Sequence, residues 1–431
     1  MDTITHGIAG ALIGKAIFGG DDLFALRPMN TRRVIGWTVM IGAIFPDFDT
    51  LRDVFSRNEL LMITSHRSIT HSLVCMPIFA LLLALLTRGA CRYLHWEAPS
   101  FAKLAALYAV GILSHIFLDL VTTYGTMIWS PLGWSRPAWD TIFIVDFTLT
   151  GILLLPQFLA WVYATKENKE KWRQRALGLW LVSELALFVA AALAQIVGAP
   201  ISPQNIAIAG LLLTVLLFLP AWKTWGMKVS QAAWNRAGFL AACVYIAMAA
   251  YAHHAAFERV KSFAAFEQLD AQAIGALPLP PSLWHWDGLV RTPRGVYDWR
   301  MDLSEKSAID PTSLNAGASG SAPATPSAQP ALEYKFYPEA PTNSFIERAK
   351  QLPEVQKVLW FDRFPVTRLS PGRSAVNLIK ISRESAPRAS RIMRSARSAI
   401  LNAGGNAGIN VPLGIVAARR ISCTASSSVK K

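Results

Sequence analysis

The feature that most limits what this chain can fold into is a series of long apolar segments within its first 260 residues. A membrane-spanning helix takes about 20 consecutive, mostly apolar residues. Two apolar runs, 4–19 and 34–45, are shorter than this, and the Gly-rich first run favours close packing against another helix. We expect six longer segments to span a membrane: 72–87, 104–121, 146–165, 176–198, 205–221 and 237–256.

The composition points to the same class of protein. Hydrophobic residues make up 52% of the chain and charged residues 16%, whereas soluble domains carry about 25% charged residues. The four cysteines are widely scattered and form neither a CxxC pair nor a disulfide framework. The start of the chain is acidic rather than basic, so we expect no cleavable signal peptide. The sequence therefore favours a polytopic membrane protein over a soluble one.

The composition changes after Tyr251. Residues 257–369 mix Trp-rich, strand-like and helical pieces, and a stretch within them, 310–331, is rich in Pro, Ala, Ser and Gly. We expect a small soluble domain that contains this stretch as a linker. Residues 370–431 are rich in Arg, Ser and Ala with almost no aromatics, so we expect disorder there. Because the change is abrupt, a tail outside its native reading frame is a second hypothesis.

The basic charge of the chain belongs to this tail. The segment from Arg363 to Lys431 carries thirteen Lys or Arg and one acid, Glu384, a net charge of +12 out of +14 for the whole chain. The rest of the chain is therefore close to neutral. The charge balance does not indicate a nucleic-acid-binding body, and we expect no specific nucleic acid partner.

Three short motifs rich in His and Asp lie at the edges of apolar segments: Pro46–Asp49, His66–Ser72 and His115–Asp119. An ionisable group beside hydrocarbon costs free energy unless a partner or a metal compensates it. Imidazole and carboxylate groups together suit divalent zinc, manganese or iron. Taken together, the motifs favour a metal site within a membrane protein.

Each motif alone also has a structural explanation. His115 and Asp119 are spaced i,i+4 and share a helix face, where they either bind one ion or hydrogen-bond to each other. His66 and His71 are five residues apart, so they converge only if His66 precedes the helix. Otherwise they belong to a surface loop that titrates with pH.

Asp47 and Asp49 follow a proline in a turn, where one can bind a metal while the other orients a ligand, or both cap the next segment. The positive-inside rule places the loops 166–175 and 222–236 in the cytoplasm. Counting spans back from them puts all three motifs on the extracytoplasmic face. Three arginines on that face argue against this sidedness: Arg52, Arg57 and Arg67.

These motifs resemble, in order and spacing, those of the bacterial inner-membrane YdjM family, whose members are described as candidate metal-dependent hydrolases. The resemblance covers about residues 1–260, and the segment 332–369 resembles the soluble end of longer members. It implies a location in the bacterial inner membrane. The residues that carry it are His6-Gly7, Pro46-Asp47-Phe48-Asp49, His66-Arg67-Ser68-Ile69-Thr70-His71-Ser72, and His115-x-x-Leu118-Asp119 followed by Thr122-Thr123-Tyr124-Gly125.

More distantly, the order of these residues is similar to that of the zinc-dependent phospholipase C and P1 nuclease group. Those helical enzymes hydrolyse phosphate esters with a zinc cluster. No second HxxxD motif follows His115, and Asp140 and Asp146 are the alternatives for it, so the number of ions stays open at one or two. The similarity implies a divalent metal, zinc first, with these ligands: His6, Asp47, His66, His115 and Asp119.

The chemistry of such a metal gives roles to the neighbouring residues. A bound zinc ion lowers the pKa of its water from 15.7 to about 7. We expect Asp49 or His71 to act as general base or to orient a ligand. Arg67 suits a substrate phosphate because its planar fork matches phosphate oxygens, with a lipid-headgroup contact as the alternative.

The sequence thus predicts an all-α polytopic membrane helical bundle with a small C-terminal soluble α+β domain and a disordered basic tail. The expected domains are 1–165 for the metal-site helices, 166–256 for additional spans, 257–369 for the soluble domain and 370–431 for the tail. The predicted function is hydrolysis of a phosphoester on a lipid-associated substrate, with the bilayer as partner and the oligomeric state open. Alternatives are a metal-binding scaffold or regulator without turnover and, third, a transporter with a His/Asp ion path.

Overall fold

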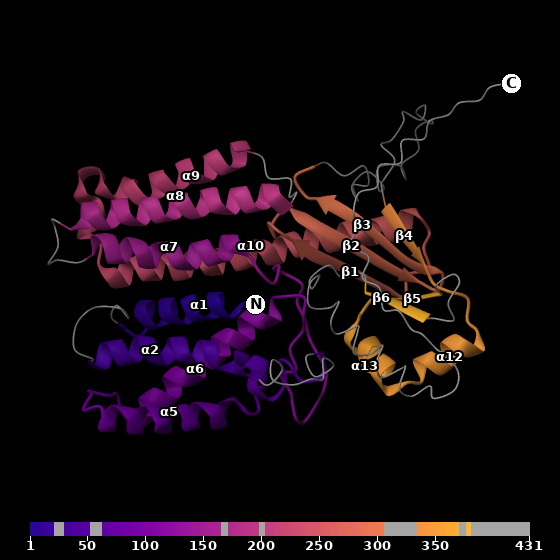
Figure 1. The fold of residues 1–431 in the computed structure, drawn as a ribbon, viewed down its shortest axis with the longest axis horizontal. Helices are drawn as coiled ribbons and strands as arrows, with labels where there is room; N and C mark the ends of the chain where they lie inside the picture. Colours follow the sequence, from indigo (N-terminus) through magenta and orange to yellow (C-terminus); the bar gives the residue numbers. More distant parts are fainter. Residues whose placement is uncertain are drawn as a thin grey trace, which may run out of the picture. The chain divides into compact units, whose positions relative to one another are not determined.

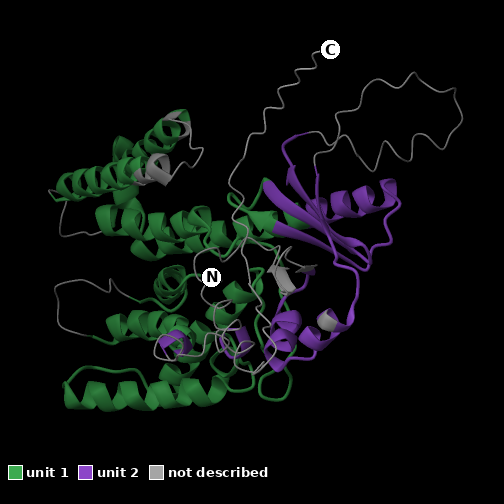
Figure 2. Cartoon of the chain, turned by 45° about the vertical axis from the view of Figure 1, so that its right-hand side comes forward, with its two compact units in different colours: residues 1–48, 67–253, 278–284 green, residues 49–66, 254–277, 285–431 purple. Residues whose placement is uncertain are grey.

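The computed structural model describes residues 1–20, 30–51, 63–164, 171–197, 203–305, 334–369 and 376–380. The expected linker at 310–331 and the expected disordered tail lie outside these residues, apart from the short strand 376–380. The chain divides into two units (Figure 2). The helical unit comprises residues 1–48, 67–253 and 278–284, and the sheet unit comprises 49–66, 254–277 and 285–431.

The helical unit is built from helices joined by loops and 3-10 turns (Figure 1). Several helices begin at a polar side chain that caps a free backbone N–H, as Asp2, Asn30, Ser100 and Asp146 do. The elements are α1 (Thr3–Ala16), α2 (Thr31–Ile44), η1 (Phe45–Phe48), η2 (Ile69–His71), α5 (Met76–Tyr93), α6 (Phe101–Leu120), α7 (Phe147–Tyr163), α8 (Trp172–Val197), α9 (Pro203–Phe218), η3 (Leu219–Lys228) and α10 (Gln231–Phe266), whose last part belongs to the sheet unit.

Several helices have the length and hydropathy of membrane spans. Five stretches qualify among the described residues, and α7 is a shorter apolar helix of the same kind. The short run predicted at 34–45 is part of one of these stretches, because helix and 3-10 turn continue to Leu51. The five are Thr31–Leu51, Met76–Tyr93, Phe101–Leu120, Ile206–Lys228 and Gln231–Phe266.

The outer faces of these helices are apolar. On α5, exposed large side chains follow one another along the helix, as expected for a surface that faces lipid rather than water. Together with the spans, this confirms the predicted helical membrane bundle. The exposed residues on α5 are Ile78, Leu81, Leu82, Leu85 and Leu86.

Small residues let α1, α2 and α6 approach one another closely. A Cβ at Gly10 of α1 would lie 2.6 Å from the Ala43 side chain of α2. A Cβ at Gly111 of α6 would lie 2.5 Å from the carbonyl oxygen of Val39. Backbones this close are typical of membrane helices packed through small residues. They bring the start of α1 and the ends of α2 and α6 together.

The sheet unit contains a small antiparallel sheet with the strand order β1-β2-β3-β4 and a separate β5-β6 pair. In the β2–β3 hairpin, His285 pairs with Asp302 and Thr292 pairs with Gly295. Leu289, Val296 and Val366 belong to the buried core of the sheet unit. This confirms the predicted α+β region. Its elements are β1 (Ala273–Leu279), β2 (His285–Thr292), β3 (Gly295–Asp302), β4 (Tyr334–Pro338), α12 (Ser344–Lys350), α13 (Pro353–Phe361), β5 (Pro365–Leu369) and β6 (Val376–Lys380).

Candidate metal centre

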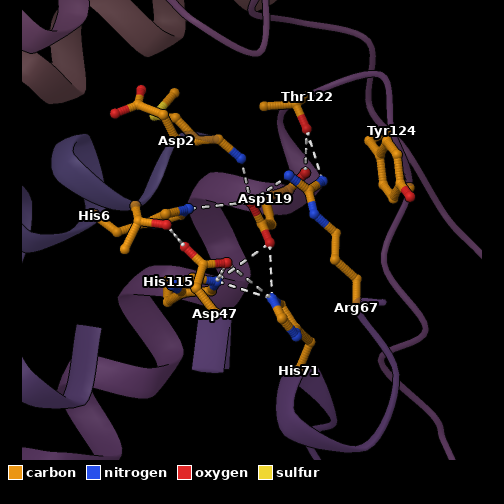
Figure 3. A network of polar contacts seen from close by, with 12 residues as sticks. Asp2, His6, Asp47, Arg67, His71, His115, Asp119, Thr122 and Tyr124 are labelled. Atoms are coloured by element: carbon orange, nitrogen blue, oxygen red, sulfur yellow. Dashed lines mark hydrogen bonds and ion pairs between the residues drawn. The ribbon is translucent and has the colours of Figure 1, made fainter. Parts of the chain in front are cut away.

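Four elements of the helical unit direct His and Asp side chains to one place at the same end of the bundle (Figure 3). His6 lies in the first turn of α1, and Asp47 lies in the 3-10 turn that follows α2. His71 ends the 3-10 turn before α5. His115 and Asp119 lie in the last turns of α6, on one face, as their i,i+4 spacing predicts.

The facing atoms of four of these residues have the mutual spacing of metal ligands. His71 Nε2 lies 3.0 Å from His115 Nε2, and each lies 3.3 Å from Asp119 Oδ2. Asp47 Oδ1 lies 3.5 Å from His115 Nε2 and 3.7 Å from His71 Nε2. Tetrahedral zinc with bonds of about 2.0–2.1 Å separates neighbouring ligand atoms by about 3.3 Å. The distances from each imidazole to the two carboxylates are therefore compatible with ligands of a divalent ion of this size.

The other polar atoms of these side chains are held by protein groups. His115 Nδ1 lies 2.6 Å from the Ala43 carbonyl oxygen and donates to it, so Nε2 keeps a lone pair directed at the cluster. The Thr3 hydroxyl donates to Asp47 Oδ2 at 2.5 Å, which leaves Oδ1 for the cluster. The Thr70 hydroxyl lies 3.0 Å from His71 Nδ1. Such outer contacts orient metal ligands.

A second group of ligand atoms shares two residues with the first. His6 Nε2 lies 3.2 Å from Asp119 Oδ1, whereas His71 and His115 pair with the other oxygen, Oδ2. The ring of His6 stacks on that of His115 with a centroid separation of 3.6 Å. His6, His115 and Asp119 offer one candidate metal set, and Asp47, His71 and His115 offer another. Two adjacent sets leave both one ion and two ions compatible with the arrangement.

The cluster is almost closed to solvent. His6, His71, His115 and Asp119 have no exposed surface, and Asp47 is 8% exposed. Asp119 Oδ2 and His6 Nδ1 are buried and, within the described part of the chain, make no hydrogen bond. Buried carboxylate oxygens without a hydrogen bond are costly unless a cation compensates them. This is a second observation that fits a bound metal.

Arg67 supplies a fixed positive charge beside the cluster. Its Nη2 lies 2.9 Å from Asp119 Oδ1, and its Nη1 donates to the Thr122 hydroxyl at 3.2 Å. The amino group of Met1 also contacts Asp119 Oδ1. Arg67 is 2% exposed and has a left-handed backbone with a φ of 59°. A non-glycine residue in this region is held there by its surroundings, and such positions cluster at functional sites.

Most of the predicted ligands come together in the structure, but their roles stay predictions. His6, Asp47, His115 and Asp119 form the cluster together with His71, which the sequence suggested as a base or orienting group. His66 belongs to neither candidate set; its Nδ1 lies 3.0 Å from Asp49 Oδ1 within the sheet unit. The Thr3 hydroxyl had no signal in the sequence, and Thr122 belongs to the Thr122–Gly125 motif, for which the sequence predicted no role.

Asp140 and Asp146, the predicted substitutes for a second HxxxD motif, belong to neither candidate metal set of the described residues. Asp146 caps α7 through Leu149 and accepts hydrogen bonds from the Tyr245 hydroxyl at 2.8 Å and the Ser282 hydroxyl at 2.5 Å. Asp140 is buried but is in neither candidate metal set among the described residues. The geometry therefore gives Asp146 a structural task at the start of a helix.

The part of the chain that holds the cluster matches a known protein family. Residues 1–199 match the family described as YdjM inner membrane protein, which confirms the resemblance for this part. The chain is also similar to the uncharacterized protein YfhP of Bacillus subtilis strain 168, with 28% identity over 133 residues. That match covers 31% of this chain and 38% of the relative. No solved structure matches the chain. The similarity to the zinc phospholipase C group stays a prediction.

Proposed function

We propose, starting from the match of residues 1–199 to the YdjM inner membrane protein family, that this multi-pass membrane protein is a metal-dependent hydrolase. Its substrate would be a phosphoester of a lipid-associated molecule. The observation that carries the proposal is the convergence of His71, His115, Asp47 and Asp119: the two Nε2 atoms lie 3.0 Å apart, and each lies 3.3–3.7 Å from one oxygen of either carboxylate. A bound zinc, or a similar divalent ion, would supply a Lewis acid and acidified water at neutral pH.

The residues of the chain divide the remaining tasks. Two imidazoles with their Nε2 atoms directed inward suit the ion, and the outer contacts to Ala43 and Thr3 hold the ligands in place. Arg67 balances Asp119 and offers the positive charge that a phosphate oxygen needs. The closed surroundings strengthen each of these electrostatic interactions, because few waters compete with them.

Burial of the cluster supports a second candidate, a metal-binding scaffold without turnover. Structural metal sites are closed by protein ligands, whereas catalytic sites keep a position open for water or substrate. Four of the five residues have no exposed surface, and only Asp47 is partly reached from outside. The two candidates differ in one property that can be measured, which is turnover at full metal occupancy.

The experiment measures metal content and phosphodiester hydrolysis on the same purified, detergent-solubilised protein. We expect bis-(p-nitrophenyl) phosphate or a phospholipid to be hydrolysed, the activity to be lost on chelation, and Zn²⁺ or Mn²⁺ to restore it. Full metal occupancy without turnover on a broad panel of phosphoesters would contradict the hydrolase and favour the scaffold. Activity that survives complete removal of the metal would contradict both.

We further propose that the centre faces the extracytoplasmic side of the inner membrane. The support is the positive charge of the loops at 166–175 and 222–236, which favours the cytoplasm. Fusion of alkaline phosphatase after Trp129, beyond the end of α6, should then be active, and fusion after Trp96, beyond α5, should be inactive. The reverse pattern would place the cluster on the cytoplasmic side.

A further inference from the structure

Beside the metal centre, backbone hydrogen bonds tie together three loop segments of the helical unit. The N–H of Met127 donates to the carbonyl of Arg67 at 2.9 Å, and the N–H of Thr126 donates to the carbonyl of Pro137 at 3.1 Å. The N–H of Trp139 donates to the carbonyl of Leu120, at the end of α6, at 2.8 Å. The loop that follows Asp119 is therefore anchored both to Arg67 and to the segment around residue 137.

Two arginines lie over one aromatic ring of this anchored loop, that of Tyr124. The guanidinium carbon of Arg67 lies 4.7 Å from the centroid of the Tyr124 ring, and that of Arg136 lies 4.9 Å from it. Figure 3 shows the Tyr124 ring beside the Arg67 side chain, on the side away from His6. Two guanidinium groups on one ring bring two positive charges together next to the ligands of the metal.

Local structure positions Arg136 for this arrangement. Its Nη2 donates to the carbonyls of Tyr124 and Gly125, at 3.2 and 3.1 Å. Gly125 has a φ of +81°, and a Cβ there would lie 3.0 Å from the carbonyl oxygen of Arg136. Only glycine fits this turn easily. The turn therefore lets the backbone at Gly125 lie close to that of Arg136, whose side chain contacts the Tyr124 ring.

The electrostatics of the pair favour an anion. Arg67 has Asp119 as its carboxylate partner, at 2.9 Å. Arg136 is partly buried, and burial lowers the pKa of its guanidinium, with the positive charge of Arg67 lowering it further. Two neighbouring guanidinium groups with limited access to water gain from an anion with several oxygens, which can accept from both planar forks.

We propose that Arg136, together with Tyr124 and Arg67, forms a phosphate-recognition site that selects phosphate-bearing substrates for the metal centre. This inference rests on the proposed function and adds its specificity determinant. Arg67 provides the continuity between the two, because its guanidinium contacts both Asp119 and the Tyr124 ring. The recognised group is a phosphate, either free or in a lipid headgroup.

The test measures phosphate binding to the metal-loaded protein by calorimetry with two probes, inorganic phosphate and phosphatidic acid in phosphatidylcholine nanodiscs. We expect Arg136→Gln to weaken binding about tenfold or more, with metal content unchanged, and Arg136→Lys to restore part of the affinity. The matched control is Arg92→Gln, an exposed arginine in the last turn of α5. Binding to nanodiscs alone would support a lipid headgroup as the source.

A measurement on the wild-type protein covers the case in which Arg136→Gln fails to fold. Phenylglyoxal labels accessible arginines, and we expect phosphate to protect Arg136 but not Arg92. No binding of either probe by the wild type, equal binding by Arg136→Gln, or no protection of Arg136 would overturn the inference. Phosphate binding that depends on Arg136 in a protein without turnover would contradict the hydrolase alone. Turnover with an unchanged KM in folded Arg136→Gln would contradict the specificity site alone.

Discussion

His115→Ala should abolish metal binding at concentrations that saturate the wild-type protein. His115 belongs to both candidate metal sets, and its Nε2 lies within 3.5 Å of His71, Asp47 and Asp119 atoms. Loss of an outer contact to a ligand typically costs 10–100-fold in metal affinity. Loss of a ligand shared by both sets should therefore cost about 100-fold or more. Competition with a chromophoric chelator measures this affinity.

Two companion variants separate loss of the ligand from loss of the fold. His115→Ala also removes a hydrogen bond to the Ala43 carbonyl, and an unsatisfied buried group costs about 1–3 kcal/mol. Asp47→Asn keeps the shape of the side chain and should weaken metal binding without this penalty. His254→Ala, an exposed histidine of α10 outside both sets, should bind metal as the wild type does. Equal metal affinity in all of these variants would rule out the cluster as the binding site.

Gly111→Ala should destabilise the helical unit and weaken the metal centre at the same time. A Cβ at this position would lie 2.5 Å from the Val39 carbonyl oxygen and 2.9 Å from the Ala43 nitrogen, both backbone atoms that cannot rotate away. Overpacking of this kind costs about 1–3 kcal/mol. Because His115 is one turn further along α6 and hydrogen-bonds to Ala43, a shift between α2 and α6 should also displace this candidate metal ligand. Thermal unfolding in detergent measures the first effect and metal titration the second.

The matched control for this substitution is Gly89→Ala in α5. A Cβ at Gly89 meets nothing within 4 Å, so the substitution should be neutral or should stabilise the helix by about 0.4–1 kcal/mol. An equal fall in the unfolding temperature for both variants would show that the effect is not one of close helix packing. An unchanged unfolding temperature and metal affinity of Gly111→Ala would contradict the close packing of α2 against α6.

The fold was largely readable from the sequence because its main determinant, apolar length, is local. The spans expected at 72–87 and 104–121 correspond to α5 (Met76–Tyr93) and α6 (Phe101–Leu120). The apolar segment expected at 34–45 is longer in the structure than the sequence predicts. In the structure the chain continues there as a 3-10 turn, so the candidate span extends from Thr31 to Leu51.

The candidate metal centre was only partly predictable, because it depends on contacts between distant segments. The i,i+4 spacing of His115 and Asp119 places both on one helix face, and the structure has them there. The choice between His66 and His71 could not be made from spacing. The position of His71 depends on a three-residue 3-10 turn, Ile69–His71, and the spacing of apolar residues does not predict such a short turn. Arg136 had no signal at all, because its place over Tyr124 follows from loop hydrogen bonds.

The most direct test of the central claim is X-ray absorption spectroscopy at the metal edge of the purified wild-type protein. The account predicts one or two tightly bound divalent ions per chain, with only nitrogen and oxygen neighbours and with scattering from more than one imidazole ring. A protein that holds no stoichiometric metal after loading would contradict it. So would a metal with sulfur neighbours, or with no imidazole in its surroundings.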